Sequence, residues 1–235
     1  MRTWATRSAV RLRAESRSEK AAAAGVARMR FALGLDHDLS EFHSMFRRDP
    51  LIGPAVRARP WLRPLRRPEP FEALAWAICE QLIETRRAFE IQRKLVRRYG
   101  RRSDCSLRDA PAAELIAGRA PAELAACGLA PKRAIAMVRA AREVASGRAD
   151  LAAHEPAWRR LRTIPNVGSW TLDMLAFHGQ GRDDRLPAGD LAYVILVGDL
   201  AGLGRRATED EVREFFEPYG QYAGLAGIYA LWSRR

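Results

Sequence analysis

The stretch LRTIPNVGSWTLDMLAFHGQGRDDRLPAGD, from Leu161 to Asp190, decides the fold of this chain. Pro165 prevents the helical pattern before it from continuing, and Gly168 lets the backbone turn and approach another molecule closely. An apolar helical pattern resumes at Ser169 and ends before a loop that contains glycine and proline. The stretch therefore predicts two helices joined by a tight hairpin, followed about twenty residues later by the carboxylate of Asp190.

The start of the second helix offers a site for an anion. The first N–H groups of a helix have no intrahelical acceptor, and they lie at the positive end of the helix dipole. A phosphate bound there needs no base-specific contact, which suits sequence-independent DNA binding. We therefore predict that Gly168, Ser169 and Thr171 contact the DNA backbone. An ordinary turn between two antiparallel helices is the alternative interpretation of the same residues.

Composition limits the class of protein. The chain has 235 residues, of which 48% are hydrophobic, and this is enough for one or two domains with a real core. It contains neither an apolar run of about 18 residues nor a signal-peptide pattern. The three cysteines, Cys79, Cys105 and Cys127, are spaced in a way that suits neither zinc nor an iron–sulfur cluster. We expect a reduced cytoplasmic protein that associates with the nucleoid.

The charge of the chain indicates a polyanionic partner. The formal net charge is +12 and the isoelectric point is about 10.6, values typical of domains that bind nucleic acid. Only three of the 40 basic residues are lysines, so the arginine excess also fits the codon bias of a GC-rich genome. Charge alone favours DNA as the partner, and it leaves a helical protein–protein adaptor as an alternative.

The pattern of most of the chain predicts helices. Residues 1–36 are expected to form a basic arm or the remnant of an α/β domain, in which AVRLRAE is a single weak strand signal. Residues 37–235 are expected to form an all-α domain of about nine or ten helices, arranged as two helical lobes with a DNA-binding cleft. One of these helices should run from Pro70 to a stop at Gly100.

The hairpin and the acid that follows it resemble the helix-hairpin-helix superfamily of DNA base-excision glycosylases. The usual hairpin is similar to L-P-G-V-G, and here Asn166 stands in place of the first glycine. Asparagine tolerates the left-handed conformation better than most residues. The resemblance implies no organic cofactor, and it implies a monovalent cation (Na or K) held by the backbone carbonyls of Arg162, Ile164 and Val167.

The resemblance gives the catalytic role to Asp190, the acid of PAGD. A carboxylate can stabilise the positive charge that develops at C1′ as a sugar loses its base, and it can orient the attacking water. Asp190 also looks like a helix N-cap, and the two roles are compatible, because a helix dipole favours an ionised carboxylate. Asp183 and Asp184 are alternatives that we rank lower, because Arg182 and Arg185 flank them as in a solvated loop.

Trp170 bears on the type of chemistry. In the bifunctional members of the superfamily, such as the endonuclease III type, this hairpin position is a lysine that attacks C1′. Tryptophan cannot do so. Those members also usually have a four-cysteine cluster near the C-terminus, whereas the last cysteine here is Cys127. The resemblance therefore implies a monofunctional enzyme that cleaves the glycosidic bond and leaves an abasic site.

The segment around Gln81 and Leu82 is similar to a helix of the 3-methyladenine DNA glycosylase II, or alkylpurine, branch. The resemblance implies that Leu82 fills the gap left by a flipped base and that Gln81 reaches toward neighbouring bases. It also places an aromatic pocket at Trp170, where stacking and cation–π attraction would hold a cationic purine. Met174 and Tyr222 are further candidate pocket residues. Core packing is the alternative role for each of these side chains.

Together these features predict a monomeric, monofunctional DNA glycosylase. It would flip and excise alkylated purines of the 3-methyladenine type from duplex DNA in base-excision repair. Two alternatives stay open: a non-catalytic DNA-binding or damage-recognition protein, and a glycosylase for a deaminated or oxidised base.

Overall fold

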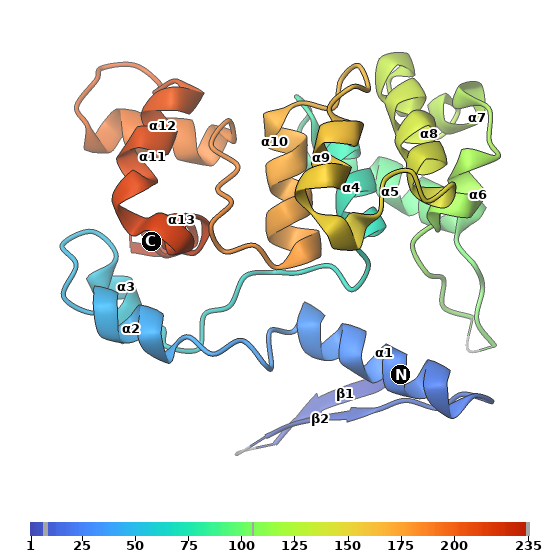
Figure 1. The fold of residues 1–235 in the computed structure, drawn as a ribbon, viewed down its shortest axis with the longest axis horizontal. Helices are drawn as coiled ribbons and strands as arrows, with labels where there is room; N and C mark the ends of the chain where they lie inside the picture. The colour runs from blue at the N-terminus through green and yellow to red at the C-terminus, as the bar shows by residue number, and fades with distance from the viewer. Residues whose placement is uncertain (7–8, 105, 234–235) are drawn as a thin grey trace.

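The computed structural model describes residues 1–6, 9–104 and 106–233, and almost all of its regular structure is helical (Figure 1). The two strands are β1 (Arg2–Ala5) and β2 (Val10–Arg13). The α-helices are α1 (Glu19–Ala32), α2 (Ser40–Phe46), α3 (Gly53–Ala58), α4 (Pro70–Glu80), α5 (Thr85–Tyr99), α6 (Ala113–Ala117), α7 (Pro121–Ala125), α8 (Pro131–Ala145), α9 (Glu155–Leu161), α10 (Ser169–Met174), α11 (Leu191–Leu200), α12 (Glu209–Phe216) and α13 (Ala223–Ser233). Short 3-10 helices are η1 (Leu151–Ala153) and η3 (Glu217–Tyr222), and η2 (Leu175–Gly179) is a π-helix that continues α10.

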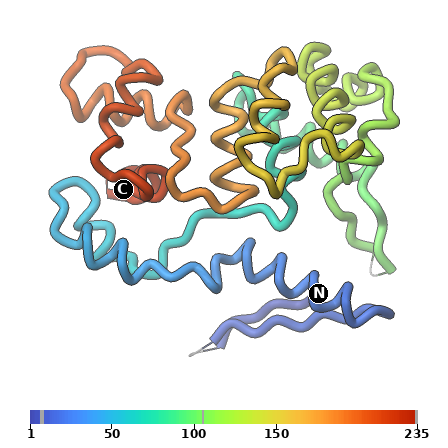
Figure 2. The backbone as a smooth tube through the Cα atoms, in the orientation of Figure 1, coloured from blue at the N-terminus to red at the C-terminus, as the bar shows by residue number. Residues whose placement is uncertain are grey.

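The helices form two lobes, each with its own apolar core, as predicted. Helices α4 to α10 enclose the first core, in which Leu74, Ile78 and Ile91 are fully buried. Helices α2, α3 and α11 to α13 enclose the second core, around Phe216 and Tyr229. The second lobe therefore combines segments from both ends of the chain, and the connector of residues 59–69 crosses between the lobes (Figures 1 and 2).

The N-terminal region is more regular than the sequence predicts. The strand expected in AVRLRAE is present as β2, but it pairs antiparallel with β1, and we expected no second strand. Helix α1 was also not predicted. It is alanine-rich and contributes no buried residue, so it lacks the apolar stripe by which a surface helix is recognised. The pair of strands β1 and β2 and helix α1 lie together below the two lobes in Figure 2. The division of the chain at residue 36 stays a prediction.

The single helix predicted from Pro70 to Gly100 is wrong. The chain leaves the helical conformation at Gln81 and re-enters it at Thr85, giving the two helices α4 and α5. No glycine or proline lies between them, and Leu82 itself adopts a left-handed backbone, with φ of 47°. The apolar periodicity of the sequence runs across this break, and therefore it concealed the turn.

One buried and one half-buried carboxylate tie the lobes together. Asp173 of α10 has an exposed fraction of 0%, and it accepts hydrogen bonds from Arg185 at 2.6 Å and from Arg213 of α12 at 2.8 Å. Asp183 accepts from Arg66 of the connector at 2.8 Å. Guanidinium groups compensate both acids, as the buried charge of Asp173 requires. The loop between α10 and α11 is thereby fixed in place.

Within the described parts of the chain, no helix combines the length and the apolar character needed to cross a bilayer. Cys79 and Cys127 are buried and free, whereas Cys105 lies outside the described residues.

Candidate active site and nucleic-acid interface

The hairpin between α9 and α10 forms as the sequence predicts. The Val167 N–H donates to the Ile164 carbonyl at 3.0 Å, which closes the turn. Asn166 adopts the left-handed conformation, with φ of 69°, so asparagine does occupy the position for which glycine is more usual. Helix α10 then begins at Ser169, with Gly168 as its N-cap residue.

The protein's own structure does not require a glycine at position 168. Its φ is −99°, which any residue can adopt, and a Cβ placed on it would have no neighbour within 4 Å. Neither packing nor backbone conformation therefore explains a glycine here. A close approach by another molecule does explain it, because a side chain would project into the space in front of the first N–H groups of α10.

The hydroxyl groups near this helix start face different ways. Ser169 is half-buried, and its hydroxyl faces the Glu209 carboxylate. Thr171 is buried, and its Oγ1 accepts a hydrogen bond from Gln81 Nε2 at 2.7 Å. The hydroxyl of Thr171 is thus engaged inside the protein, so a phosphate contact at this residue would have to use its backbone N–H.

The turn between α4 and α5 projects Leu82 away from the protein. The exposed fraction of this side chain is 106%, the highest among the large hydrophobic residues described. Gln81, beside it, does not project outward. Its Nε2 donates to the Asn166 carbonyl and to Thr171 Oγ1, both at 2.7 Å. The predicted wedge residue therefore lies on the surface, next to the hairpin.

The acidic residues that flank the pair are accommodated separately. Glu80 is turned inward, and its Oε1 accepts from Gln92 Nε2 at 2.8 Å. Burial raises the pKa of Glu80, and the charge of Asp190 adds to that rise. Glu84 is exposed at the start of α5. Neither the inward direction of Glu80 nor its link to Gln92 could be predicted while the two helices were treated as one.

Asp190 is the N-cap residue of α11. Its Oδ1 accepts the Ala192 N–H at 2.9 Å, and its side chain is half-buried. Around it lie Glu80, His178 and Tyr193, on each of which its charge acts. The acid predicted to be catalytic is thus held at a helix terminus, near the junction of both lobes.

Trp170 lies beside this acid. A Cβ placed on Gly189 would be 3.8 Å from the Cβ of Trp170, so the first turn of α10 packs against the residue that precedes Asp190. Met174 follows one turn later on α10, and both side chains are half-buried. The structure therefore places Trp170 next to Gly189, the residue that precedes Asp190.

His178 is a neighbour of Asp190 that sequence reasoning missed. Its Nδ1 bonds to the Leu65 carbonyl at 2.6 Å, and because a carbonyl only accepts, Nδ1 carries the proton. Burial lowers the pKa of His178, which favours the neutral ring with an accepting Nε2. His178 lies four residues after Met174, and this helical spacing was the one signal in the sequence that could place it near the predicted pocket. A single histidine in an apolar helical segment is not a distinctive pattern.

The second aromatic group of the predicted pocket is placed differently. The Tyr222 ring packs edge-on against Phe42 of α2, with a centroid separation of 5.5 Å, and also contacts Phe46. Tyr229, on α13, is fully buried and donates to the Leu62 carbonyl at 3.2 Å. These contacts give both tyrosines a packing role in the second lobe.

The two alternative acids are used in ion pairs. Asp184 accepts two hydrogen bonds from Arg182 at 2.8 Å, as the flanking arginines suggested. Asp183 instead binds Arg66 and His37 from distant segments, so the explanation of a solvated loop is wrong for this residue. Both contacts leave Asp190 as the preferred catalytic candidate.

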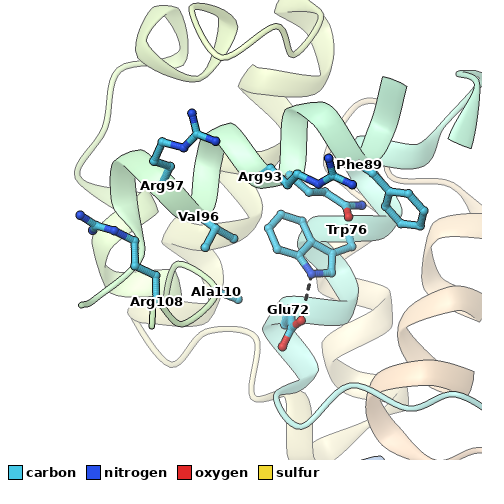
Figure 3. Close-up of a pocket in the computed structure, with 9 residues that line it drawn as sticks. Glu72, Trp76, Phe89, Arg93, Val96, Arg97, Arg108 and Ala110 are labelled. Carbon is cyan, nitrogen blue, oxygen red and sulfur yellow. Dashed lines mark hydrogen bonds between the residues drawn. The ribbon is translucent and has the colours of Figure 1, made fainter. Parts of the chain in front are cut away.

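Two cavities flank this region. One, of about 860 Å³, lies beside the hairpin between α9, α10 and α12, and Arg162 and Ser169 are among its lining residues. The other, of about 680 Å³, lies between α4 and α5 (Figure 3). There the Trp76 indole donates to Glu72 at 3.0 Å, with Arg93 on the adjoining helix. Asp190 lines neither cavity.

The hairpin carbonyls are compatible with a bound cation. The Ile164 carbonyl accepts one N–H, from Val167, and a carbonyl oxygen has a second lone pair available. Side-chain ligands are a separate matter: in the described parts of the chain, no group of three or more His, Cys, Asp or Glu residues is placed to bind a metal. The carbonyl site therefore stays a prediction.

Two curated proteins are similar to this chain in sequence. A DNA-3-methyladenine glycosylase of Bacillus subtilis is 27% identical over 206 residues, covering 84% of this chain and 68% of the relative. DNA-3-methyladenine glycosylase 2 of Escherichia coli is 30% identical over 184 residues, covering 74% and 62%. The chain thus spans about two thirds of the length of these relatives.

The fold is also found among solved structures. The 3-methyladenine DNA glycosylase of Archaeoglobus fulgidus superposes with a TM-score of 0.79 at 22% identity, covering 96% of this chain and 79% of that one. Residues 75–221 match the family described as HhH-GPD superfamily base excision DNA repair protein. This range contains the turn between α4 and α5 that carries Leu82 (the wedge turn), the hairpin and Asp190. The chain belongs to the HhH-GPD superfamily of base-excision DNA repair proteins.

Proposed function

We propose that this protein is a monofunctional DNA glycosylase that acts as a monomer and excises alkylated purines from duplex DNA. The observation that carries the proposal is that Asp190 is the N-cap of α11 and directly follows Gly189, which packs against Trp170 of α10. Both curated relatives have names of 3-methyladenine glycosylases, which supports alkylated purines as the substrate class.

Asp190 is assigned the central role in bond cleavage. As the glycosidic bond breaks, the electron pair leaves with the purine and positive charge develops on the sugar at C1′. A carboxylate facing C1′ stabilises this charge and orients a water for addition to the same carbon. The cap bond to Ala192 fixes the direction of the side chain, so that the charge is in place before the reaction begins.

Trp170 is assigned to the base. An alkylated purine is cationic and electron-poor, and an indole face attracts such a ring by stacking and by cation–π interaction. Met174, one turn along α10, would form the apolar wall next to it. The same tryptophan leaves no amine at the hairpin position, so the reaction should end at the abasic site.

DNA is held by the hairpin and opened by Leu82. The backbone N–H groups at Gly168, Ser169 and Thr171 would bind phosphate oxygens, while the exposed Leu82 fills the space that the flipped base leaves in the stack. The carbonyls of Arg162, Ile164 and Val167 would hold a monovalent cation, whose positive charge would draw a phosphate toward the hairpin.

The test is mass spectrometry of the bases released from methylated duplex DNA. Release of methylated purines by the wild type, with intact strands until alkali is added, supports the proposal. Binding without any released base would instead indicate a damage-recognition protein. Release of only deaminated or oxidised bases from DNA carrying those lesions would indicate a different substrate class.

A further inference from the structure

The turn that carries Leu82 has a conformation that its own sequence does not favour. Leu82 has φ of 47°, a left-handed conformation that leucine rarely adopts, and its side chain makes no packing contact that would compensate for it. The neighbouring residues in the turn are Gln81, Ile83 and Glu84, none of which is a turn former. The conformation must therefore be imposed by groups outside the turn.

Gln81 makes the first of these external contacts. Its side-chain amide lies 2.7 Å from the Asn166 carbonyl and 2.7 Å from Thr171 Oγ1. A carbonyl can only accept, so the nitrogen of the amide must face it, and its two N–H groups serve the two acceptors. One acceptor belongs to the hairpin turn and the other to α10, so this one side chain joins the wedge turn to both parts of the hairpin.

Arg133 of α8 holds the same turn from the other side. Its Nη1 donates to the Cys79 carbonyl at 3.0 Å and to the Gln81 carbonyl at 2.8 Å. These carbonyls lie at the C-terminal end of α4, where the helix leaves such groups without an intrahelical partner. The charged donor therefore ends the helix where the left-handed residue follows.

We propose that Gln81 is a positioning residue that locks the wedge turn onto the hairpin, with Arg133 as its counterpart on α8. The inference rests on the proposed function, because it concerns how Leu82 enters the base stack. Both N–H groups of the Gln81 amide are engaged by the protein's own acceptors, which leaves neither of them to read the neighbouring bases. When the hairpin binds a phosphate, the same contact sets the position of Leu82 relative to that phosphate, and base flipping needs no rearrangement of the turn.

The first test uses Gln81→Met, which keeps the length of the side chain and removes both donors. Hydrogen–deuterium exchange in the free protein should become faster at residues 81–85, whether or not the enzyme acts on any lesion. In single-turnover assays on alkylated duplex DNA, the excision rate should fall about tenfold, as expected for the loss of two hydrogen bonds. The exposed Gln221→Met is the matched control and should leave both measurements unchanged.

The second test asks whether Gln81 acts through Leu82. In a Leu82→Ala background, Gln81→Met should cause no further loss of excision or of 2-aminopurine fluorescence that reports flipping. Thr171→Val, which removes the oxygen that accepts from Gln81, should behave like Gln81→Met.

The possible failures are distinguishable. Unchanged exchange at residues 81–85, or an equal loss of rate with and without Leu82, would overturn the inference. A lower melting temperature with a normal excision rate would also overturn it. If the wild type itself releases no base, the proposed function fails, and the exchange data still decide whether Gln81 fixes the turn.

Discussion

The carboxylate of Asp190 accepts the backbone N–H of Ala192 at 2.9 Å, so this residue caps helix α11. None of the other described residues donates a hydrogen bond to its second oxygen, Oδ2. Capping and catalysis therefore use the same side chain but need different properties of it. The cap needs an accepting oxygen, which asparagine also provides, whereas stabilisation of a sugar cation needs a negative charge.

Replacing Asp190 by Asn should therefore separate the two roles. The excision rate should fall by roughly 10²–10³-fold, because the charge opposite C1′ is lost. The free energy of unfolding should stay within about 0.5 kcal/mol of the wild type, because asparagine caps a helix as well as aspartate does. Asp190→Ala should lose the same activity and about 1 kcal/mol of stability as well. Single-turnover excision and chemical denaturation measure the two effects.

Asp150 provides a matched control. Its Oδ1 accepts the N–H of Ala152 at 2.9 Å, so it caps η1 as Asp190 caps α11, but it lies outside the hairpin and α11. Asp150→Asn should leave excision unchanged. If Asp190→Asn retained wild-type turnover, the catalytic assignment would be wrong and Asp190 would be only a cap.

Gly168 leads to a second prediction, because an added methyl group there meets nothing in the protein. Gly168→Ala should leave the free energy of unfolding within about 1 kcal/mol of the wild type. Its affinity for duplex DNA should nevertheless fall about tenfold, because the methyl group blocks a phosphate from the N–H groups, and a hydrogen bond to a charged group contributes about 1.5–3 kcal/mol. Fluorescence anisotropy at fixed salt measures the affinity.

The control for this substitution is Gly118→Ala. Gly118 also has a negative φ, of −84°, and its added Cβ would meet only one atom, at 3.9 Å. Its substitution should not change DNA affinity. Equal affinities of the Gly168→Ala protein and the wild type would show that the hairpin is an ordinary turn.

The sequence predicted the fold best where local chemistry determined local structure. Pro165 and Asn166 predict a turn, and Asp190 predicts a helix start, because each residue acts on its own backbone or on the next two residues. The structure shows a hairpin turn and a helix start at these positions. Such signals do not depend on contacts with distant parts of the chain.

The sequence failed where distant contacts overrule the local pattern. The break at Leu82 depends on contacts with distant parts of the chain. Gln81 donates hydrogen bonds to Asn166 and Thr171, which are 85 and 90 positions further along. Arg133, more than fifty residues further along, donates to the Gln81 carbonyl. Nothing in the segment itself reports these contacts. The burial of Thr171 and the inward direction of Glu80 were missed for the same reason.

Trp170 should contribute to selectivity for cationic bases. Trp170→Ala should lower kcat/KM for release of 7-methylguanine by about tenfold or more, because stacking on an aromatic side chain contributes roughly 1–3 kcal/mol per base. Trp170→Phe should retain an intermediate value, since phenylalanine still stacks but attracts a cation less. Trp61→Ala, at an exposed tryptophan of the connector, is the control. Equal kcat/KM values for Trp170→Ala and the wild type would assign Trp170 to the core.

The absence of a lysine at position 170 predicts a reaction without a Schiff base. Incubation of the wild type with alkylated duplex DNA and borohydride should give no covalent protein–DNA product, while abasic sites accumulate. Gel electrophoresis under denaturing conditions checks both statements, with a bifunctional glycosylase as the positive control. A trapped adduct would mean that another amine of the chain attacks C1′.

Glu80 gives a prediction about pH. Burial raises the pKa of this carboxyl, so the folded protein keeps its proton at pH values where the unfolded chain has already lost it. The stability that this proton provides is complete below the ordinary carboxyl pKa of 4.5, and it is lost as the pH rises through the folded-state pKa. Glu80→Gln cannot ionise and keeps an oxygen for the amide of Gln92. The variant should therefore gain stability relative to the wild type as the pH rises from about 5 to 8.

Glu143 should show the opposite sign and serves as the internal control. Hydrogen bonds from Arg148 and Arg160 lower its pKa to about 2, so its contribution is present above the ordinary pKa and is lost as the pH falls toward 2. Glu143→Gln should therefore lose stability relative to the wild type at neutral pH, and the difference should shrink in acid. Denaturation curves at a series of pH values measure both pairs. Parallel pH profiles for Glu80→Gln and the wild type would show that the folded protein does not raise the pKa of Glu80.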